Sequence, residues 1–381
     1  GRPSPDATEA ATAPEPATEA PTPPAPPVVG FKKGFFIASP DDAFRLTLGL
    51  RAQVRFELET ADGAPRTNSA AFLLPRVRIK FNGHAFDERI AFSLQMDFAK
   101  GGVSLKDAWV DLKGNDWLIL RMGQFKTPHA RHFLTSSTKL QLVDRAITSK
   151  AFDLDRDIGV MLLNDWKSSP LEYAIGVFNG TGDKGSWSGD VLVDPATGEG
   201  DLLGAKASNV PELPNPLVVL RVGGHTPDFD GYSETDPGHS DFGVGVGGGV
   251  YFDFDADNDD DAGVGGNIDF ALKVKGLSTS GAFYLKAEQD GAGIGDQALH
   301  SFGGHVSVGY AIKGRVEPVV RYARVTVVDG SAHSEEILGG VNVYLFHHNV
   351  KWVTDAGALI AIASGESSTD FRIRTQLQLD F

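Results

Sequence analysis

The residues best suited to chemistry lie in one basic stretch of an otherwise acidic chain. The 381-residue protein carries a formal net charge of −15, yet residues 126–150 hold a single acid, Asp144. The same stretch contains five cations: Lys126, Arg131, Lys139, Arg145 and Lys150. Guanidinium groups can hold an oxyanion through two parallel hydrogen bonds, and clustered Lys and Arg side chains favour anions. This stretch is therefore the first candidate for an anion-binding surface.

The basic stretch belongs to a long connection between two β-patterned segments, DWLILRMGQF and DIGVMLL. A connection of about thirty residues among short hairpins is either functional or disordered. Its composition argues against disorder because apolar residues recur along it, namely Phe133, Leu134, Leu140, Leu142, Val143, Ile147 and Phe152. We expect a folded, cationic insert.

Composition limits the class of protein that carries this insert. The chain has no cysteine, which excludes disulfides and thiolate chemistry, and no apolar window long enough for a transmembrane helix. The opening residues, GRPSPDATEA, lack the pattern of a signal peptide, so we expect either a cytosolic protein or numbering that begins after signal removal. Forty-five glycines, 24 phenylalanines and few helix-period patterns favour an all-β chain.

Strict alternation of apolar and polar residues begins at Phe44. In residues 44–58 Phe, Leu, Ala and Val fall on one face, and Arg, Thr, Gln and Glu fall on the other. The pattern predicts sixteen strands: 44–58, 71–84, 88–99, 104–112, 116–125, 157–164, 171–179, 217–225, 241–254, 263–275, 277–288, 300–311, 315–325, 336–346, 349–362 and 370–381. A phase break at Pro75 predicts a β-bulge.

The connections between these strands divide into two sets. One side has mostly long links, including the basic insert, residues 180–216 and the acidic run around Asp253 to Asp261, and the other has tight turns. Long loops at one rim and short turns at the other are typical of an outer-membrane barrel. The basic insert is the third link on the long side. Residues 226–240 are too long for the short side, which puts the strand count in question there.

A soluble β-sandwich would also alternate, but its strands usually run to five or six residues. The predicted strands are long enough for a tilted membrane crossing, and a closed barrel would place apolar faces against lipid and polar faces around water. The sequence therefore predicts a closed, sixteen-stranded antiparallel transmembrane β-barrel over residues 31–381. Residues 1–30, rich in Pro, Ala, Thr and Glu, are expected to form a disordered tail.

Three segments resemble those of a known family: LLPRVRIKFNGHAFDERIAFSLQMDFAKGGVSLKDAWVDLKG, LRMGQFKTPHARHFLTSSTKLQLVDRAI and RDIGVMLL. The most specific part is MGQFKTP followed by LTSS. By these segments the chain resembles the phosphate-selective porin O and P family of Gram-negative outer membranes. The resemblance implies a homotrimeric channel in the outer membrane, whose third long loop folds into the lumen. It also implies passive passage of small anions such as phosphate, contact with lipid and lipopolysaccharide, and a periplasmic N-terminal tail.

In such a channel, rings of Arg and Lys would set anion selectivity. The candidate residues are the loop cations Lys126, Arg131, Lys139 and Arg145 together with the wall cations Arg45, Arg51, Arg55, Arg76, Arg78, Lys80, Arg121, Arg221, Arg321, Arg372 and Arg374. The alternative for any wall arginine is a structural ion pair, with Asp97, Asp107, Asp111 or Glu57 as partner.

Other function classes have less support in the residues. We expect no enzyme, because the candidate Ser–His neighbourhood on the outer rim, His333 beside Ser331 and Ser334, lies in a loop of ordinary turn composition. No cofactor, no metal site and no nucleic-acid partner are expected. The acidic run from Asp253 supplies oxygen ligands but lacks the distant Glu of a calcium loop. A non-conducting structural or adhesive barrel, tethered by the Pro-rich tail, remains the alternative function.

Overall fold

The fold is taken from a computed structural model of the chain. The structure describes residues 1, 26–32, 34–62, 67–180, 186–193, 200–208, 216–254, 263–289, 298–328, 332–363 and 365–381. No helix in these ranges is long and apolar enough to cross a membrane.

The described residues form twenty strands, two short α-helices and one 3₁₀ turn. The strands are β1 (Val28–Phe31), β2 (Phe35–Ala38), β3 (Arg45–Ala61), β4 (Thr67–Ala85), β5 (Asp87–Asp97), β6 (Ser104–Asn115), β7 (Leu118–Lys126), β8 (Arg156–Leu163), β9 (Leu171–Phe178), β10 (Ser186–Val193), β11 (Gly200–Ser208), β12 (Leu217–His225), β13 (Gly243–Asp253), β14 (Gly263–Val274), β15 (Leu277–Gln289), β16 (Ala298–Tyr310), β17 (Val316–Val327), β18 (Ala332–Phe346), β19 (Val350–Ala363) and β20 (Glu366–Asp380). The helical elements are η1 (Ala99–Gly101), α1 (Arg131–Leu134) and α2 (Ile147–Phe152).

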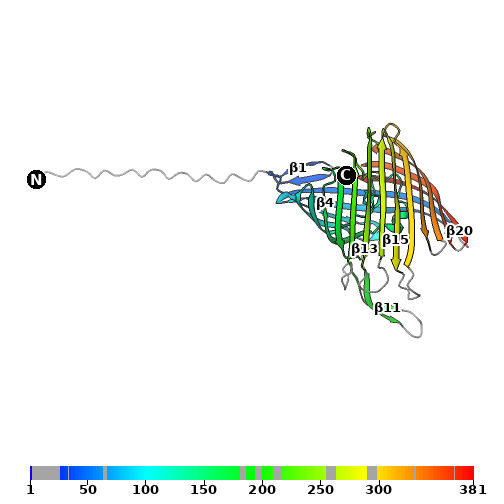
Figure 1. Ribbon diagram of the computed structural model, residues 1–381. Coiled ribbons are helices and arrows are strands. Elements are labelled where there is room, and N and C mark those ends of the chain that lie inside the picture. The colour runs from blue at the N-terminus through cyan, green and yellow to red at the C-terminus, as the bar shows by residue number, and fades with distance from the viewer. Residues whose placement is uncertain are drawn as a thin grey trace.

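Sixteen of these strands close into one antiparallel barrel (Figure 1). Each strand from β3 to β9 and from β12 to β20 pairs with its neighbour in sequence, and β9 pairs directly with β12. The ring closes where β20 pairs with β3, from Phe371 opposite Thr60 to Asp380 opposite Arg51. The predicted sixteen-stranded barrel is confirmed, and each predicted strand overlaps an observed one.

The structure adds two hairpins that alternation did not predict. Residues 180–216, predicted as a strandless link, contain β10 and β11, which pair only with each other beyond one rim (Figure 1). Strands β1 and β2 form a second hairpin, and β2 pairs with the start of β3 beyond the reach of β20. Strands β1 and β2, with four residues each, are too short to display a period of two. Of the predicted tail, residues 2–25 lie outside the described ranges.

The predicted bulge at Pro75 is present. Gln53 of β3 lies opposite Arg76 of β4, but Arg55 lies opposite Leu73, so β4 has one extra residue beside Pro75. Proline cannot donate to the ladder, and a bulge accommodates it because the extra residue is unpaired. The shift turns the following residues, including Arg76 and Arg78, toward the lumen.

The alternating faces separate the outer wall of the barrel from its lumen. Outward side chains such as Ile268, Val320 and Val222 are exposed on the outer wall, whereas inward side chains such as Arg221 and Gln53 are buried. This division follows from the strand period of two. It places rows of charged side chains inside the ring of strands.

The short-turn rim contains one long link, residues 226–242, between β12 and β13. The predicted count of sixteen strands is correct there, because the link joins two neighbouring strands of the barrel. The link itself folds inward, and Gly231, Ser233, Glu234, Thr235 and Asp236 are all buried. Tight turns elsewhere on the rim use left-handed backbone, as at Lys275 and Gly276, with φ of 49° and 93°. An inward loop satisfies its polar groups against the lumen wall.

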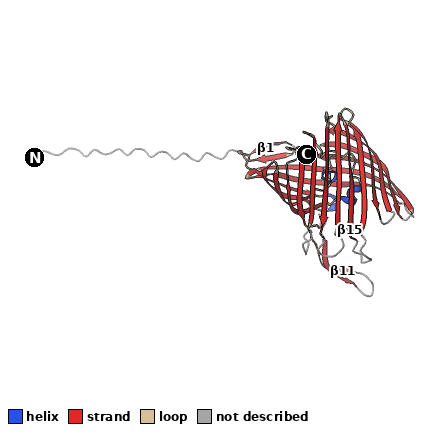
Figure 2. Cartoon of the chain, viewed as in Figure 1, coloured by secondary structure: helices blue, strands red, loops and turns tan. Residues whose placement is uncertain are grey.

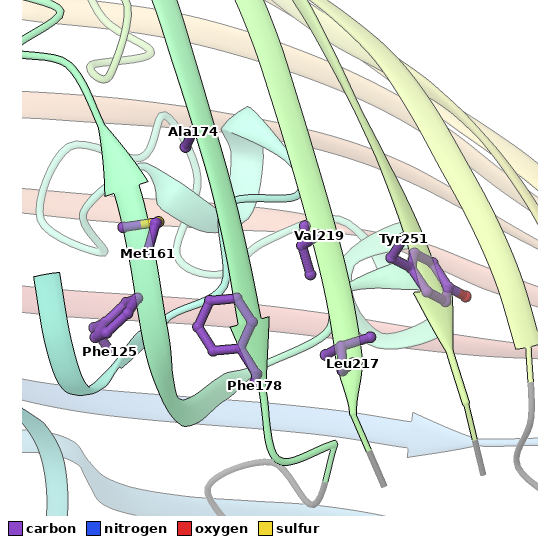
Figure 3. Close-up of a cluster of buried hydrophobic side chains, with 7 residues drawn as sticks. All are labelled: Phe125, Met161, Ala174, Phe178, Leu217, Val219 and Tyr251. Atoms are coloured by element: carbon purple, nitrogen blue, oxygen red, sulfur yellow. The ribbon is translucent and has the colours of Figure 1, made fainter. Parts of the chain in front are cut away.

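Part of the inner wall is apolar. Figure 3 shows seven buried side chains from five adjacent strands, β7, β8, β9, β12 and β13: Phe125, Met161, Ala174, Phe178, Leu217, Val219 and Tyr251. Leu154, near the end of the basic insert, packs against this cluster. The cluster thus anchors the insert where it rejoins the wall.

Candidate functional site

The basic insert, residues 127–155, contacts strands around the whole ring. Its hydrogen bonds reach β3 (Arg51 Nη1 to Ser137 Oγ, 3.0 Å) and β15 (Gln141 Nε2 to Ser278 Oγ, 2.8 Å). They also reach β19, where Asp355 accepts from the Val143 amide at 3.0 Å. Strands so far apart in the ring can be bridged only through the lumen, where Figure 2 draws the two short helices behind the strands.

Apolar side chains hold the insert against the β15–β18 wall. Phe152 of α2 stacks on Tyr284 of β15, with ring centroids 5.1 Å apart. Leu142 packs with Val319 and Leu338 in a second buried cluster. Burying such side chains contributes about 1.5–3 kcal/mol each, which fixes the insert on one side of the lumen.

The inward loop 226–242 supports the insert from the short-turn rim. Lys139 Nζ lies 2.8 Å from Asp230 Oδ2, and the Gln141 amide donates to Glu234 Oε2 at 2.9 Å. The Glu234 amide in turn donates to the Lys139 carbonyl at 3.0 Å. The insert and this loop together fill the β12–β20 side of the lumen.

Open space remains on the opposite side, between the insert and the β3–β8 wall. It is a cavity of about 690 Å³. Three carboxylates line it, Asp97, Asp107 and Asp155, against nine cations: Arg51, Arg76, Arg78, Lys80, Lys106, Lys126, Arg145, Lys150 and Arg156. The cavity is therefore strongly cationic.

A second cavity of about 380 Å³ continues toward the short-turn rim. Its lining includes Trp166 and Lys167 of the 164–170 turn. It shares Lys80, Asp107, Lys126, Leu134 and Arg156 with the first cavity, so the two spaces meet at these residues. Together they form a passage along one wall.

Two cations that line the larger cavity, Lys126 and Arg145, have no carboxylate partner in an ion pair among the described residues. Lys126 Nζ donates to the backbone carbonyls of Phe133, Leu134 and Thr135 at 2.5–3.2 Å. Arg145 donates to carbonyls of the same turn, at 2.9 Å for His132. Burial and nearby Arg76 lower the pKa of Arg145 to about 10, which keeps it charged at neutral pH. Carbonyls orient these cations without cancelling their charge.

Lys80 and Lys150 are still less constrained. Both side chains are exposed to the cavity, and within the described ranges neither has an ion pair or hydrogen bond. Other lining cations are paired, as Arg78 is with Asp97 at 2.7 Å and Arg156 with Asp107 at 2.9 Å. Lys80 and Lys150 thus provide mobile positive charge in the passage.

On the covered side, arginines pair with buried carboxylates. Arg321 and Arg372 both contact Glu336, at 2.8 and 2.7 Å, and Arg374 donates twice to Asp355 at 2.8 Å. Arg221 and Arg131 share Asp269 at 2.7 and 2.8 Å. These pairs satisfy buried charges.

The predicted site residues separate into three sets. Those lining the larger cavity are Lys126, Arg145, Arg51, Arg76, Arg78 and Lys80, and those lining the smaller one only are Arg121 and Arg221. Those lining neither are Arg131, Lys139, Arg45, Arg55, Arg321, Arg372 and Arg374. The pairs predicted as the structural alternative occur at Arg78–Asp97, Arg121–Asp111 and Arg55–Glu57.

Three lining cations were not among the predicted site residues: Lys106, Lys150 and Arg156. Alternation from Asp107 would place Lys106 on the outer face of the barrel. The strand register shifts at this point: Gln95 lies opposite Asp107 and Met96 lies opposite Leu105, so that Lys106 is an extra residue in β6. That β-bulge turns Lys106 inward. Arg156 lies just before the predicted strand 157–164, but in the structure it begins β8 opposite Lys126.

No metal site was predicted, and among the described residues no group of three His, Asp or Glu side chains could hold an ion. Asp255, Asp257 and Asp259 of the acidic run lie outside the described residues.

The chain is similar to a known protein family and to solved barrel structures. The model of the phosphate-selective porin O and P family matches residues 44–225, which confirms the resemblance seen in the sequence. No curated protein sequence matches the chain.

Solved structures share the fold at low identity. An anion-selective porin from Comamonas acidovorans is 11% identical, with a TM-score of 0.57, covering 88% of this chain and 99% of that one. The outer membrane channel DcaP of Acinetobacter baumannii is 14% identical, with a TM-score of 0.56, covering 91% and 99%. OmpF of Salmonella typhi, solved with daunomycin, is 13% identical, with a TM-score of 0.57, covering 90% and 99%. The family model thus covers residues 44–225, and the solved structures show that the chain has the fold of these porin barrels.

Proposed function

From a porin barrel whose residues 44–225 match the phosphate-selective porin O and P family, we propose a passive channel that favours small anions. One observation carries the proposal: nine cations and three carboxylates line the larger cavity. A ring of cations at a constriction lowers the energy of an anion and raises that of a cation. Selectivity then comes from the β3–β8 side of the lumen.

The residues have different tasks in this proposal. Lys126, where the two cavities meet, and Arg145, in the larger one, are oriented by backbone carbonyls and provide charge at fixed positions. Lys80 and Lys150 have free ammonium groups that can follow a passing ion. Conduction requires several weak sites rather than one tight one, and lysines exposed to water fit that requirement.

Phosphate is the solute that the family name suggests, and the lumen has suitable chemistry. Guanidinium groups recognise phosphate oxygens through paired donors, and Arg51, Arg76, Arg78 and Arg156 all line the larger cavity. We include phosphate among the permeating anions. We also propose a homotrimer, contact with lipopolysaccharide on the outer wall, and a periplasmic tail, as in the porin type.

Planar-bilayer recording of the purified protein tests the proposal. We expect stepwise conductance, an anion-favouring reversal potential in a KCl gradient, and reduction of chloride current by millimolar phosphate. Folded protein without conductance would favour a structural barrel. Conductance that phosphate does not reduce would support the channel but contradict phosphate as one of its permeating anions.

A further inference from the structure

Three arginines converge on the only acid in residues 126–150, Asp144. Its carboxylate lies 2.7 Å from Arg55 Nη1, 3.2 Å from Arg76 Nη2 and 3.2 Å from Arg374 Nη1. The arginines come from β3, β4 and β20, whereas Asp144 comes from the insert. One carboxylate thus occupies a position that three guanidinium groups surround.

Each guanidinium is also held by an acceptor of its own. Arg55 donates to Gln376 through Nε and Nη2, at 3.2 and 3.1 Å, and to Glu57 through Nη1 at 3.2 Å. Arg76 donates to Gln53 at 2.9 Å through Nη1. Arg374 uses Nε and Nη2 on Asp355, at 2.8 Å each. Arg76 Nη2 and Arg374 Nη1 contact Asp144, and Arg55 Nη1 divides its two hydrogens between Glu57 and Asp144. The wall therefore orients all three donors independently of Asp144.

The charges around this position do not balance without Asp144. Arg55 retains Glu57 and Arg374 retains Asp355, but Arg76 has no other ion pair among the described residues. Burial alone would raise the pKa of the Asp144 carboxyl, but Arg76 and Arg55 outweigh it and hold that pKa below its ordinary value. The carboxylate is therefore a permanent anion in a cationic site.

The site communicates with the passage. Arg76 lines the larger cavity, and the Asp144 side chain is 30% exposed. The backbone on either side is anchored, because the Val143 amide donates to Asp355 and Arg321 donates to the Asp144 carbonyl at 2.8 Å. The side chain can rotate away while the backbone stays in place.

We propose that Arg55, Arg76 and Arg374 form an oxyanion-binding site that Asp144 occupies as a tethered competitor. The ligand class is a small tetrahedral oxyanion, phosphate or sulfate, because three converging N–H donors match oxygens at several corners, which chloride lacks. In the wild type, Asp144 keeps the affinity low, so that an entering oxyanion is released. The inference rests on the proposed anion channel and names the site within it.

The test is oxyanion binding by Asp144→Ala in detergent, measured without any current. Inorganic phosphate should raise the thermal unfolding midpoint of Asp144→Ala much more than that of the wild type, with KCl of equal ionic strength as reference. In bilayers, half-block of chloride current should need at least about tenfold less phosphate, the factor that one charge-assisted hydrogen bond contributes.

Three further variants identify the site. Asp144→Asn is the substitution that changes the side-chain shape least. It should also gain phosphate binding, but less than Asp144→Ala does, because its amide still fills the space. The double variant Asp144→Ala, Arg76→Gln should lose the gain. Asp230→Ala removes a carboxylate whose one ion-pair partner in the described part of the chain is Lys139, and this variant should gain no phosphate binding.

A phosphate response of Asp144→Ala and Asp144→Asn no larger than that of the wild type would overturn the proposal. An equal response of Asp230→Ala would also overturn it, because the effect would then be general electrostatics. Sulfate distinguishes an oxyanion site from a phosphate-specific one, and equal binding of both is expected. Failure of the channel itself would appear separately, as absent wild-type conductance.

Discussion

On the β3–β8 side of the lumen, Lys80, Lys126 and Arg145 carry charges that no carboxylate compensates in an ion pair within the described residues. On the β17–β20 side, Arg321, Arg372 and Arg374 contact buried Glu336 and Asp355 and are covered by the insert. The same residue types thus occupy two different environments. In the proposed channel a cation in the passage acts on solutes, whereas a cation under the insert satisfies the charges of the wall.

Removing a cation on the covered side should have the largest effect, which is a loss of folding stability. Arg374→Met leaves Asp355, which is fully buried, without its cation, and breaking a buried pair costs about 3–5 kcal/mol. Urea unfolding in detergent micelles measures the loss. Arg374→Lys, which keeps the charge, should recover part of it. Unchanged stability in Arg374→Met would show that the pair is not buried as described.

Removing one cation on the open side should change selectivity instead. Lys80→Gln should reduce the anion-to-cation permeability ratio roughly fivefold, as about 1 kcal/mol at 4 Å in water implies. Its stability should stay within about 0.5 kcal/mol of the wild type, since Lys80 is exposed. The matched control is Arg372→Gln, which removes a luminal cation under the insert. Equal changes of reversal potential in both variants would contradict the division of the lumen.

Proton uptake near the passage should have a smaller effect. Burial raises the pKa of Asp153, after α2, to about 7 from its ordinary value of 3.8. Because the folded-state pKa is the higher one, the neutral form stabilises the fold, and this contribution falls as pH rises from about 4 through 7. Ionised Asp153 also opposes anions, so anion selectivity should decline between about pH 6 and pH 8. Asp153→Asn should remove the decline, and reversal potentials at the two pH values measure it.

The smallest effect concerns the contact between the insert and the inward loop. Lys139 and Asp230 are both partly exposed, so their pair should contribute about 0.2–1 kcal/mol. Lys139→Asp should increase open-channel noise, because like charges then separate the two loops. Adding Asp230→Lys restores the attraction and the wild-type net charge, and should restore the quiet current. Noise that persists in the double variant would contradict the supporting role of this loop.

The sequence predicted the barrel well because every long strand repeats the same two-residue period. Strands β10 and β11 and the β1–β2 hairpin escaped prediction because they pair outside the sixteen-strand pattern. Arg76 was assigned to the lumen from its phase after Pro75. Lys106 was missed because a bulge, which one strand alone does not reveal, reverses its direction.

The ion-pair partners of the charged side chains were harder to predict than the strand face on which each side chain lies. The partners of Arg55 and Arg374 include Asp144, which is 89 and 230 residues away in sequence. Asp144 was counted only as the exception in a basic stretch. Equally, nothing local to residues 226–242 indicates that they fold inward, because their partners Lys139 and Gln141 lie in the insert. Such contacts depend on the closed ring, which brings distant segments together.

The central claim is that free cations on the β3–β8 side set selectivity. The most direct measurement is the reversal potential of Lys80→Glu, Lys150→Glu beside the wild type in one KCl gradient. We predict an anion-favouring potential for the wild type and a potential shifted toward cations for the double variant. Identical potentials, or a cation-favouring wild type, would contradict the claim.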